Sequence, residues 1–131
     1  MFSQNESNFL KSQSLARIAT ASRGGEPDVA PVGFEFDGEH FYVGGLDVQN
    51  TLKYKNALTN PRAAIVFDDL QSTDPWTPRG IKVRGAADIV ERQGRLGTKP
   101  YIRIKPEIKW TWGIDEPAIR DGKSNVKRYK L

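Results

Sequence analysis

Short stretches in which apolar and polar residues alternate dominate the chain and predict β-strands rather than long helices. The expected strands cover residues 15–22, 28–36, 40–44, 63–67 and 81–91, with one or two more within 101–112. Asp37-Gly38 is a strong signal for a hairpin turn between the second and third of these strands. About six short strands joined by hairpins favour a mainly β fold, an antiparallel barrel with no internal repeats.

Two helices interrupt the strand pattern. A central helix is expected to begin at Asn50 or Thr51, both good capping residues, and to end before Asn60-Pro61. Residues 7–13 are expected to add one or two helical turns near the N-terminus. Residues 68–80 read as a long loop, and residues 114–131 as a polar, basic tail that is mobile or folds only against a partner. The prediction is a single domain, 1–131, with a core at about 8–113.

The amino-acid composition excludes several kinds of catalytic and metal site. The chain of 131 residues has no cysteine and one histidine, which excludes disulfides, cysteine-ligated metals and thiol nucleophiles and argues against a histidine metal cluster. No apolar run reaches the roughly 20 residues of a membrane span, and no secretion signal is visible, so a cytoplasmic location and no membrane association are expected. No metal site is expected either. Asp68, Asp69 and Asp74 lack a calcium-loop spacing and read as turn and capping residues.

Charge is unevenly distributed along the chain. Residues 1–78 hold 6 Lys/Arg against 10 Asp/Glu, whereas residues 79–131 hold 14 Lys/Arg against 6 Asp/Glu. The basic second half is either a solvated surface or a surface that attracts an anionic small molecule. Nucleic acid is not expected as a partner, because the basic residues alternate with apolar ones and form no single run.

The start of the central helix is the best candidate for an anion site. Free backbone N–H groups and the helix dipole favour a negative charge there, and Thr51 and Lys53 add donors in the first turn. Gly44-Gly45 just upstream lets a ligand approach the backbone. The alternative is an ordinary helix cap beside a lysine that faces solvent.

Several other residues have a ligand-binding interpretation beside a structural one. The segment 31–34 contains a strand proline, which marks an edge, a bulge or a wall for a planar ring. Trp76, Trp110 and Trp112 could stack on a cofactor or pack in a core or dimer interface. Arg79 could reach a phosphate or remain a surface residue. Because no nucleophile has a base beside it, enzymatic chemistry would have to come from a cofactor.

Five stretches carry a resemblance to a known family. They are residues 15–20, 27–38, 40–45, 68–80 and 83–87, followed by Tyr-Ile-Arg-Ile-Lys-Pro (101–106) and Trp-Thr-Trp-Gly (110–113). In their order and spacing they resemble the split β-barrel proteins of the pyridoxamine 5'-phosphate oxidase class, and more narrowly its coenzyme F-420-dependent (deazaflavin) oxidoreductases. The resemblance covers about residues 8–113.

The resemblance implies a six-stranded antiparallel split barrel that forms a homodimer with cofactor sites at its interface. Thr51 and Lys53 match the residues that bind the cofactor phosphate in that family, whereas the arginine between them is Leu52 here. The segment 31–34 would line the cofactor ring, and the partner subunit would close the site near Arg79-Gly80. The candidate cofactor-binding residues are therefore Pro31, Val32, Gly33, Phe34, Asn50, Thr51, Lys53, Trp76, Arg79, Gly80 and Trp110.

The implied activity is transfer of a hydride from F-420 to a flat, unsaturated organic substrate. Leu52 weakens the case for tight FMN binding, and pyridoxamine phosphate oxidation is not expected because residues for the substrate phosphate have no convincing counterpart. The alternatives are an FMN-binding reductase or oxidase on the same fold, and a non-catalytic binder of a flavin or tetrapyrrole. The sequence assigns no catalytic residue.

Overall fold

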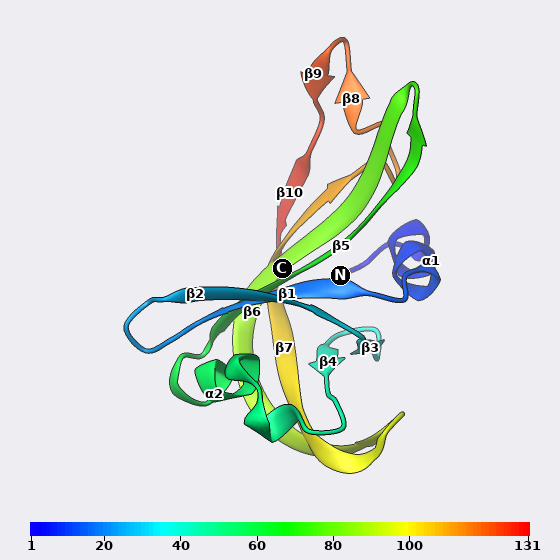
Figure 1. Cartoon of the computed structure of the whole chain (residues 1–131). Helices are drawn as coiled ribbons and strands as arrows, with labels where there is room; N and C mark the ends of the chain where they lie inside the picture. Colours follow the sequence, from blue (N-terminus) through cyan, green and yellow to red (C-terminus); the bar gives the residue numbers. More distant parts are fainter.

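The computed structural model describes the whole chain, residues 1–131, as an antiparallel β-structure with two α-helices (Figure 1). The elements are α1 (Gln4–Ser12), β1 (Ala16–Ala21), β2 (Pro27–Val32), β3 (Glu35–Phe36), β4 (Phe41–Val43), the 3₁₀ turn η1 (Val48–Asn50), α2 (Leu52–Thr59), β5 (Arg62–Thr73), β6 (Trp76–Gly94), β7 (Gly97–Trp112), β8 (Ile119–Arg120), β9 (Lys123–Ser124) and β10 (Lys127–Lys130). The mainly β fold predicted from the sequence is confirmed. The number of strands is larger than the six expected, because short strands flank the main ones.

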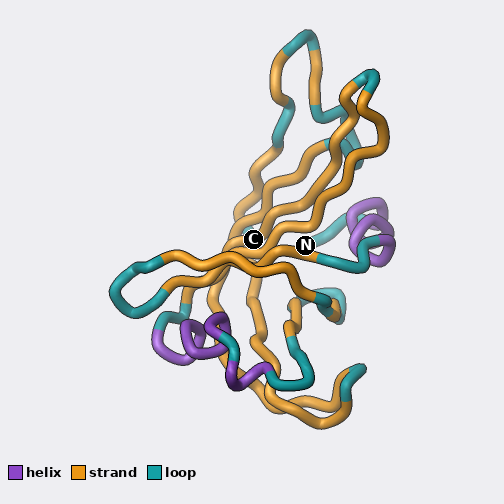
Figure 2. Tube along the Cα trace, in the orientation of Figure 1, coloured by secondary structure: helices purple, strands orange, loops and turns teal.

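One eight-stranded sheet forms the body of the molecule, in the order β2-β1-β5-β6-β7-β4-β3, with β10 pairing on β7. All of its ladders are antiparallel. The long strands β5, β6 and β7 lie side by side, and β6 and β7 continue beyond β5 and curve strongly at one end, where β4 pairs with β7 and β3 with β4 (Figure 1, Figure 2). A register shift between Arg84 and Gly85 interrupts the β6–β7 ladder, as a bulge does where a sheet bends.

The predicted loop over residues 68–80 is wrong. β5 continues to Thr73 and β6 begins at Trp76, so the two strands extend as a hairpin with a tight turn at Asp74-Pro75. Asp69 lies opposite Arg79 in this ladder, and Asp68 forms an ion pair with Arg17. Asp68 and Asp69 are therefore ion-pair partners within a strand rather than turn or capping residues, whereas Asp74 lies in the turn, as predicted.

The predicted second strand is also shorter than expected. It divides into β2 and the two-residue β3, with Gly33-Phe34 between them outside any strand. The C-terminal segment, expected to be mobile or to fold only on a partner, forms strands within its own chain. β8 and β9 make a small separate hairpin, and β10 pairs with β7 through Lys127 to Lys130.

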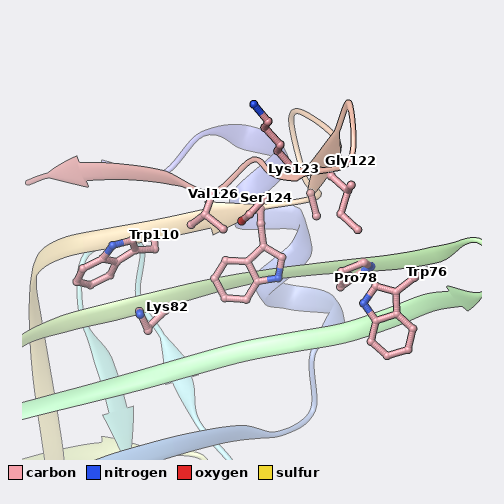
Figure 3. Close-up of a pocket in the computed structure, with 11 residues that line it drawn as sticks. Trp76, Pro78, Lys82, Trp110, Gly122, Lys123, Ser124 and Val126 are labelled. Carbon is pink, nitrogen blue, oxygen red and sulfur yellow. The ribbon is translucent and has the colours of Figure 1, made fainter.

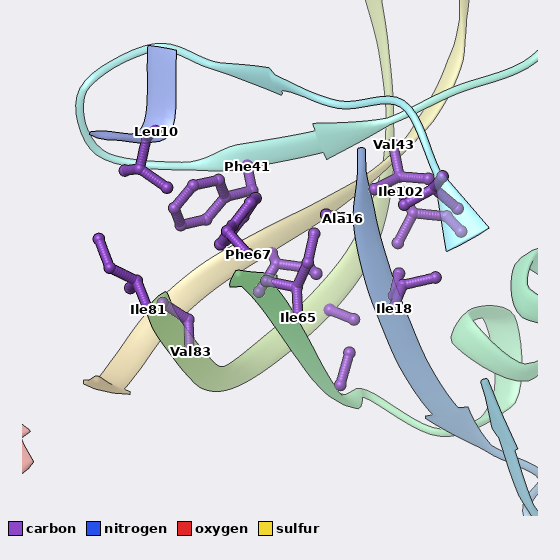
Figure 4. Close-up of a cluster of buried hydrophobic side chains, with 14 of the residues drawn as sticks. Leu10, Ala16, Ile18, Phe41, Val43, Ile65, Phe67, Ile81, Val83 and Ile102 are labelled. Atoms are coloured by element: carbon purple, nitrogen blue, oxygen red, sulfur yellow. The ribbon is translucent and has the colours of Figure 1, made fainter. Parts of the chain in front are cut away.

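A continuous apolar core lies inside the curved sheet and beneath α1 (Figure 4). Its fully buried members come from alternate positions of the strands, as in the run Ile81 and Val83 of β6. The ring of Phe34 lies 4.6 Å from that of Phe67 and so joins the segment after β2 to the core. Burying each such side chain contributes about 1.5–3 kcal/mol, which makes the core the main source of stability.

Both helices have identifiable N-terminal caps. α1 begins with a capping box in which Ser3 and Glu6 exchange side-chain and backbone hydrogen bonds, three residues before the expected start. Thr51 caps α2, one of the two residues predicted. Neither helix is of the length and apolar character needed to cross a membrane.

Candidate functional site

The N-terminus of α2 carries no opposing carboxylate. The first turn has no acidic residue, and neither Lys53 nor Lys55 forms an ion pair within the chain. Thr51 Oγ1 accepts a hydrogen bond from Tyr54 N at 3.4 Å and donates one to Val48 O at 2.6 Å, so it organises the turn. Free N–H groups beside two unpaired ammonium groups form an environment that favours an anion.

Asn50 does not share in that arrangement. Its amide donates to Asp47 Oδ1 at 2.8 Å, which stabilises the 3₁₀ turn before the helix. Leu52 is 56% exposed at the position between Thr51 and Lys53. An exposed leucine at this place offers no hydrogen bond to a ligand, and Lys53 remains the cation of the first turn that the sequence analysis singled out.

A hollow of about 350 Å³ lies next to the loop that leads into η1 and α2. Backbone at Gly33, Gly44 and Gly45 forms part of its lining, together with Phe34 and Tyr101. No heavy atom lies within 4 Å of the place where a side chain at Gly33 would begin, so the backbone is open there. At Gly44 a Cβ would lie 2.5 Å from the Tyr101 ring, so only glycine lets this tyrosine pack there.

The four residues predicted to form a ring-binding wall divide between three environments. Gly33 and Phe34 line the hollow, as just described. Val32 is 6% exposed and belongs to the core. Pro31 is exposed on the edge strand β2, where its missing N–H breaks no ladder, and it pairs with Arg17.

A second and larger cleft, of about 490 Å³, lies between the β6–β7 sheet and the β8–β9 hairpin (Figure 3). Trp76, Lys82 and Trp110 line its sheet side, and Lys123 and Val126 its hairpin side. Trp76 is 59% exposed, which is unusual for so large an aromatic residue. The cleft therefore brings together two of the predicted site residues, Trp76 and Trp110, with residues of the C-terminal segment.

Trp112 forms a further wall of this cleft, and Gly80 positions it. A Cβ at Gly80 would lie 2.3 Å from the Trp112 ring, so the indole lies directly against the β6 backbone. Gly80 is buried beneath it. The structure thus gives Gly80 a packing function, and its predicted contact with a cofactor stays a prediction.

Three cations surround Trp110. Lys82 Nζ lies 4.3 Å from the centre of its ring, Arg84 Cζ at 5.3 Å and Arg128 Cζ at 5.9 Å. These distances are those of cation–π interactions. None of the three cations has a carboxylate partner in the chain. The result is an aromatic surface with uncompensated positive charge.

Arg79 is engaged within the chain. Its guanidinium donates from Nε to Asp69 Oδ1 at 2.8 Å and from Nη2 to Asp69 Oδ2 at 2.9 Å, and it lies 4.9 Å from the Phe9 ring. Hydrogen bonds from Arg79 hold the pKa of Asp69 below its usual range despite the opposing effect of burial. Arg79 therefore joins α1 to the β5–β6 hairpin, and its predicted ligand contact stays a prediction.

The two candidate regions lie at opposite ends of the long strands. α2 and the glycine-lined hollow are at the curved end with β3 and β4, whereas the tryptophan cleft is at the end with β8 and β9 (Figure 1). Within one chain the structure does not bring Lys53 and Trp110 together.

Sequence reasoning missed the charged part of the cleft. The alternation that placed Lys82 and Arg84 on one face of a strand was visible, but their position beside Trp110 depends on the register of β6, β7 and β10. The hairpin side, with Lys123, was part of the segment taken for a tail. The chain contains no group of three or more histidine or acidic residues arranged to hold a metal ion.

Comparison with known proteins identifies the family. The family model described as pyridoxamine 5'-phosphate oxidase matches residues 2–104. A 5a,11a-dehydrotetracycline/5a,11a-dehydrooxytetracycline reductase from Streptomyces rimosus subsp. rimosus is 36% identical over 121 residues, which cover 87% of this chain and 84% of the reductase.

Solved structures support the same fold at lower identity. The haem storage protein HutZ from Vibrio cholerae matches with a TM-score of 0.63 and 15% identity, covering 94% of this chain and 100% of HutZ. An FAD-binding protein from Mycobacterium smegmatis matches with a TM-score of 0.60 and 22% identity, covering 78% of this chain and 84% of that protein. At these identities the likeness concerns the fold alone. Because the family model matches most of the chain and the reductase is 36% identical over most of both chains, the chain belongs to the pyridoxamine 5'-phosphate oxidase family of split-barrel proteins.

Proposed function

We propose that this protein is an F-420-dependent reductase that transfers a hydride to a flat, unsaturated organic substrate. The observation that carries the proposal is the 36% identity, over most of both chains, to a reductase of dehydrotetracyclines. That relationship supports the broader statement that the chain is an oxidoreductase. The relative is named as a reductase of dehydrotetracyclines. We propose a related flat, unsaturated molecule as the substrate of this protein.

The residues present fit a flavin-like cofactor with a phosphate. The first turn of α2 has free backbone N–H groups, no carboxylate and the unpaired Lys53, which together suit a phosphate. The hollow beside Gly33, Gly44 and Gly45 leaves backbone open to a planar ring. When bound, reduced F-420 would supply a hydride for reduction of a conjugated C=C bond of the substrate.

Two features favour F-420 over FMN. Leu52 stands where the resemblance calls for an arginine, so the phosphate site has one cation fewer than a tight FMN site would have. F-420 carries a phosphate and a polyglutamate tail and is more anionic than FMN. The unpaired Lys53 and Lys55 on α2, and the net charge of +4 of the whole chain, suit the more anionic molecule.

A homodimer would complete the site. The phosphate region and the tryptophan cleft lie at opposite ends of one chain, so a two-fold pairing could bring α2 of one copy beside the cleft of the other. Several large apolar side chains are exposed in the single chain, including Val29 at 68%, Leu46 at 83% and Trp76 at 59%. They lie on β2, in the loop before η1 and at the start of β6, and a second copy of the chain would cover part of this exposed apolar surface.

In this arrangement the protein contributes position rather than acid–base groups. Lys53 and the α2 N–H groups would hold the phosphate, the glycine-lined hollow would hold the ring, and the tryptophans would hold a flat substrate and exclude water. Orientation of two reactants can contribute several kcal/mol to lowering the barrier. No side chain in the site is assigned as a proton donor.

The test is turnover. Purified protein is mixed with reduced F-420 and 5a,11a-dehydrotetracycline, and oxidation of the cofactor is followed by its absorbance alongside product analysis. Catalysed oxidation with matching product supports the proposal. Turnover with reduced FMN instead supports the FMN-dependent alternative. Tight binding of a flavin or a tetrapyrrole with no turnover of this or other flat acceptors supports the non-catalytic binder, for which the shared fold with HutZ is the reason to test haem.

A further inference from the structure

The outer face of the sheet beside the large cleft is organised in cross-strand rows. Trp110 of β7 lies opposite Lys82 of β6 on one side and opposite Arg128 of β10 on the other. In the next row Ile108 lies between Arg84 and Lys130. Because strand residues two apart point to the same side, both rows face away from the core. Buried Ile81, Val83 and Lys109 occupy the opposite face.

The cations of these rows differ from other arginines of the sheet, which are bound to carboxylates. Arginines elsewhere on the sheet have carboxylate partners, such as Arg17 with Asp68, Arg62 with Glu107 and Arg103 with Asp88. Lys82, Arg84, Lys123, Arg128 and Lys130 form no ion pair.

One carboxylate of the C-terminal segment, Glu116, is already neutralised, and Asp121, two residues before Lys123, forms no ion pair with any of these cations. Glu116 pairs with Arg120 at 3.4 Å and with Lys127 at 3.8 Å. The cations of this face therefore have no carboxylate bound to them, and an anion would be attracted to the face.

The shape of the cleft limits the kind of anion. Its volume of about 490 Å³ falls in the range of small-molecule sites, roughly 300–1,000 Å³. Trp76, Trp110 and Trp112 give it flat apolar walls, and Pro78 and Val126 add aliphatic surface. Lys82 lines it from the sheet and Lys123 from the hairpin, and the ammonium group of Lys123 points away from the tryptophans (Figure 3). Indole walls favour a flat ring system, and Lys82 favours one that carries a negative charge.

We propose that this cleft binds the substrate, and that the substrate class is flat, polycyclic molecules carrying a negative charge, such as an ionised enol or phenol, that Lys82 recognises. The assignment of the ligand as the substrate rests on the proposed function; the preference for flat anions rests on the cleft alone. Trp76 and Trp110 then contact the substrate rather than the cofactor. The β8–β9 hairpin forms one wall of the site.

The experiment measures binding without any cofactor. The intact protein is titrated with anthraquinone-2-sulfonate, a flat tricyclic anion, and with the neutral 2-(hydroxymethyl)anthraquinone, by quenching of tryptophan fluorescence. Lys82 is exposed, so its contribution to anion binding is expected to be modest. We expect the anion to bind about tenfold more tightly than the neutral probe, and Lys82→Gln to weaken anion binding about threefold to tenfold without affecting the neutral probe.

Matched variants separate a specific site from general attraction. Lys82→Arg keeps the charge and should retain the preference for the anion, whereas Lys99→Gln removes an unpaired lysine at the far end of β7 and should have no effect. Trp76→Ala should weaken both probes. Equal binding of the two probes, or equal effects of Lys82→Gln and Lys99→Gln, would overturn the proposal.

The binding of the two probes is measured without cofactor, so it tests the cleft assignment separately from the proposed function. If the protein prefers the anionic probe but binds no F-420, the cleft assignment stands and the proposed function fails. If F-420 binds but the protein binds the two probes equally, the cleft assignment fails and the proposed function stands. If anthraquinone-2-sulfonate is displaced by F-420 in simple competition, the cleft belongs to the cofactor and the assignment to substrate is wrong.

Discussion

Replacing Lys109 by methionine should destabilise the fold strongly, because it leaves a buried carboxylate without its counter-charge. Lys109 Nζ lies 2.7 Å from Glu6 Oε1 and 2.6 Å from the carbonyl oxygen of Met1, and the side chains of Lys109 and Glu6 are 8% and 4% exposed. The pair fastens α1 to β7. Removing one partner of such a buried pair costs about 3–5 kcal/mol of the free energy of unfolding.

That loss of unfolding free energy corresponds to a measurable fall in the melting temperature. At roughly 4 °C per kcal/mol for a chain of this size, the midpoint of unfolding should fall by roughly 12–20 °C. The double variant Glu6→Leu/Lys109→Met leaves no charge buried and should recover most of the loss, apart from about 1 kcal/mol for the capping hydrogen bond that Glu6 makes with Ser3 N at 2.7 Å.

Urea and thermal unfolding of the wild type, both single variants and the double variant form the cycle that measures the coupling. Lys105→Met is the matched control, since Lys105 is 48% exposed and lies 3.8 Å from Asp88; it should change the free energy by no more than about 0.5 kcal/mol. The reasoning is refuted if Lys109→Met behaves like this control, or if the double variant is no more stable than the single one.

Three further predictions concern the site, the hairpin and the assembly. Lys53→Ala should weaken F-420 binding roughly tenfold to a hundredfold while the apoprotein melts at nearly the same temperature; unchanged affinity in a calorimetric titration would make Lys53 an ordinary surface lysine. Asp69→Asn should cost about 1 kcal/mol at neutral pH, allowing for the one-third exposure of the pair. Because Arg79 lowers the folded-state pKa of Asp69, this stabilisation exists above the unfolded value near 3.8 and is lost as pH falls through the lower folded pKa. Urea unfolding at several pH values checks this, and a gap between wild type and variant that persisted in strong acid would contradict it. Light scattering at micromolar concentration should give twice the chain mass of 14.7 kDa; a monomer that still binds cofactor would exclude the dimer.

Local sequence rules predicted the parts of the fold whose pattern is set by one buried face. Alternation identified β1 and the core part of β6, and the Thr51 cap and Asn60-Pro61 placed α2. The same rules failed over residues 68–80. There the β5–β6 hairpin extends beyond the core and most of its residues are exposed or half-buried, so its strands lack apolar alternation and resemble a loop.

In the candidate site, too, some residues could be predicted from local sequence and others could not. Lys53 was predictable because a helix start and its neighbours are close in sequence. The cluster of Lys82, Trp110 and Arg128 was not, because it depends on pairing of β6, β7 and β10, which are up to about 46 residues apart. The strand β10 itself consists of four exposed residues, and no hydrophobic pattern marks it.

The central claim is that the protein binds F-420 in preference to FMN, and isothermal titration of the apoprotein with each cofactor tests it directly. At low ionic strength F-420 should bind more tightly than FMN, and its affinity should fall as salt is added, because salt screens the attraction between exposed charges. Tighter binding of FMN, or a protein that is yellow with an FMN spectrum as purified, would contradict the claim.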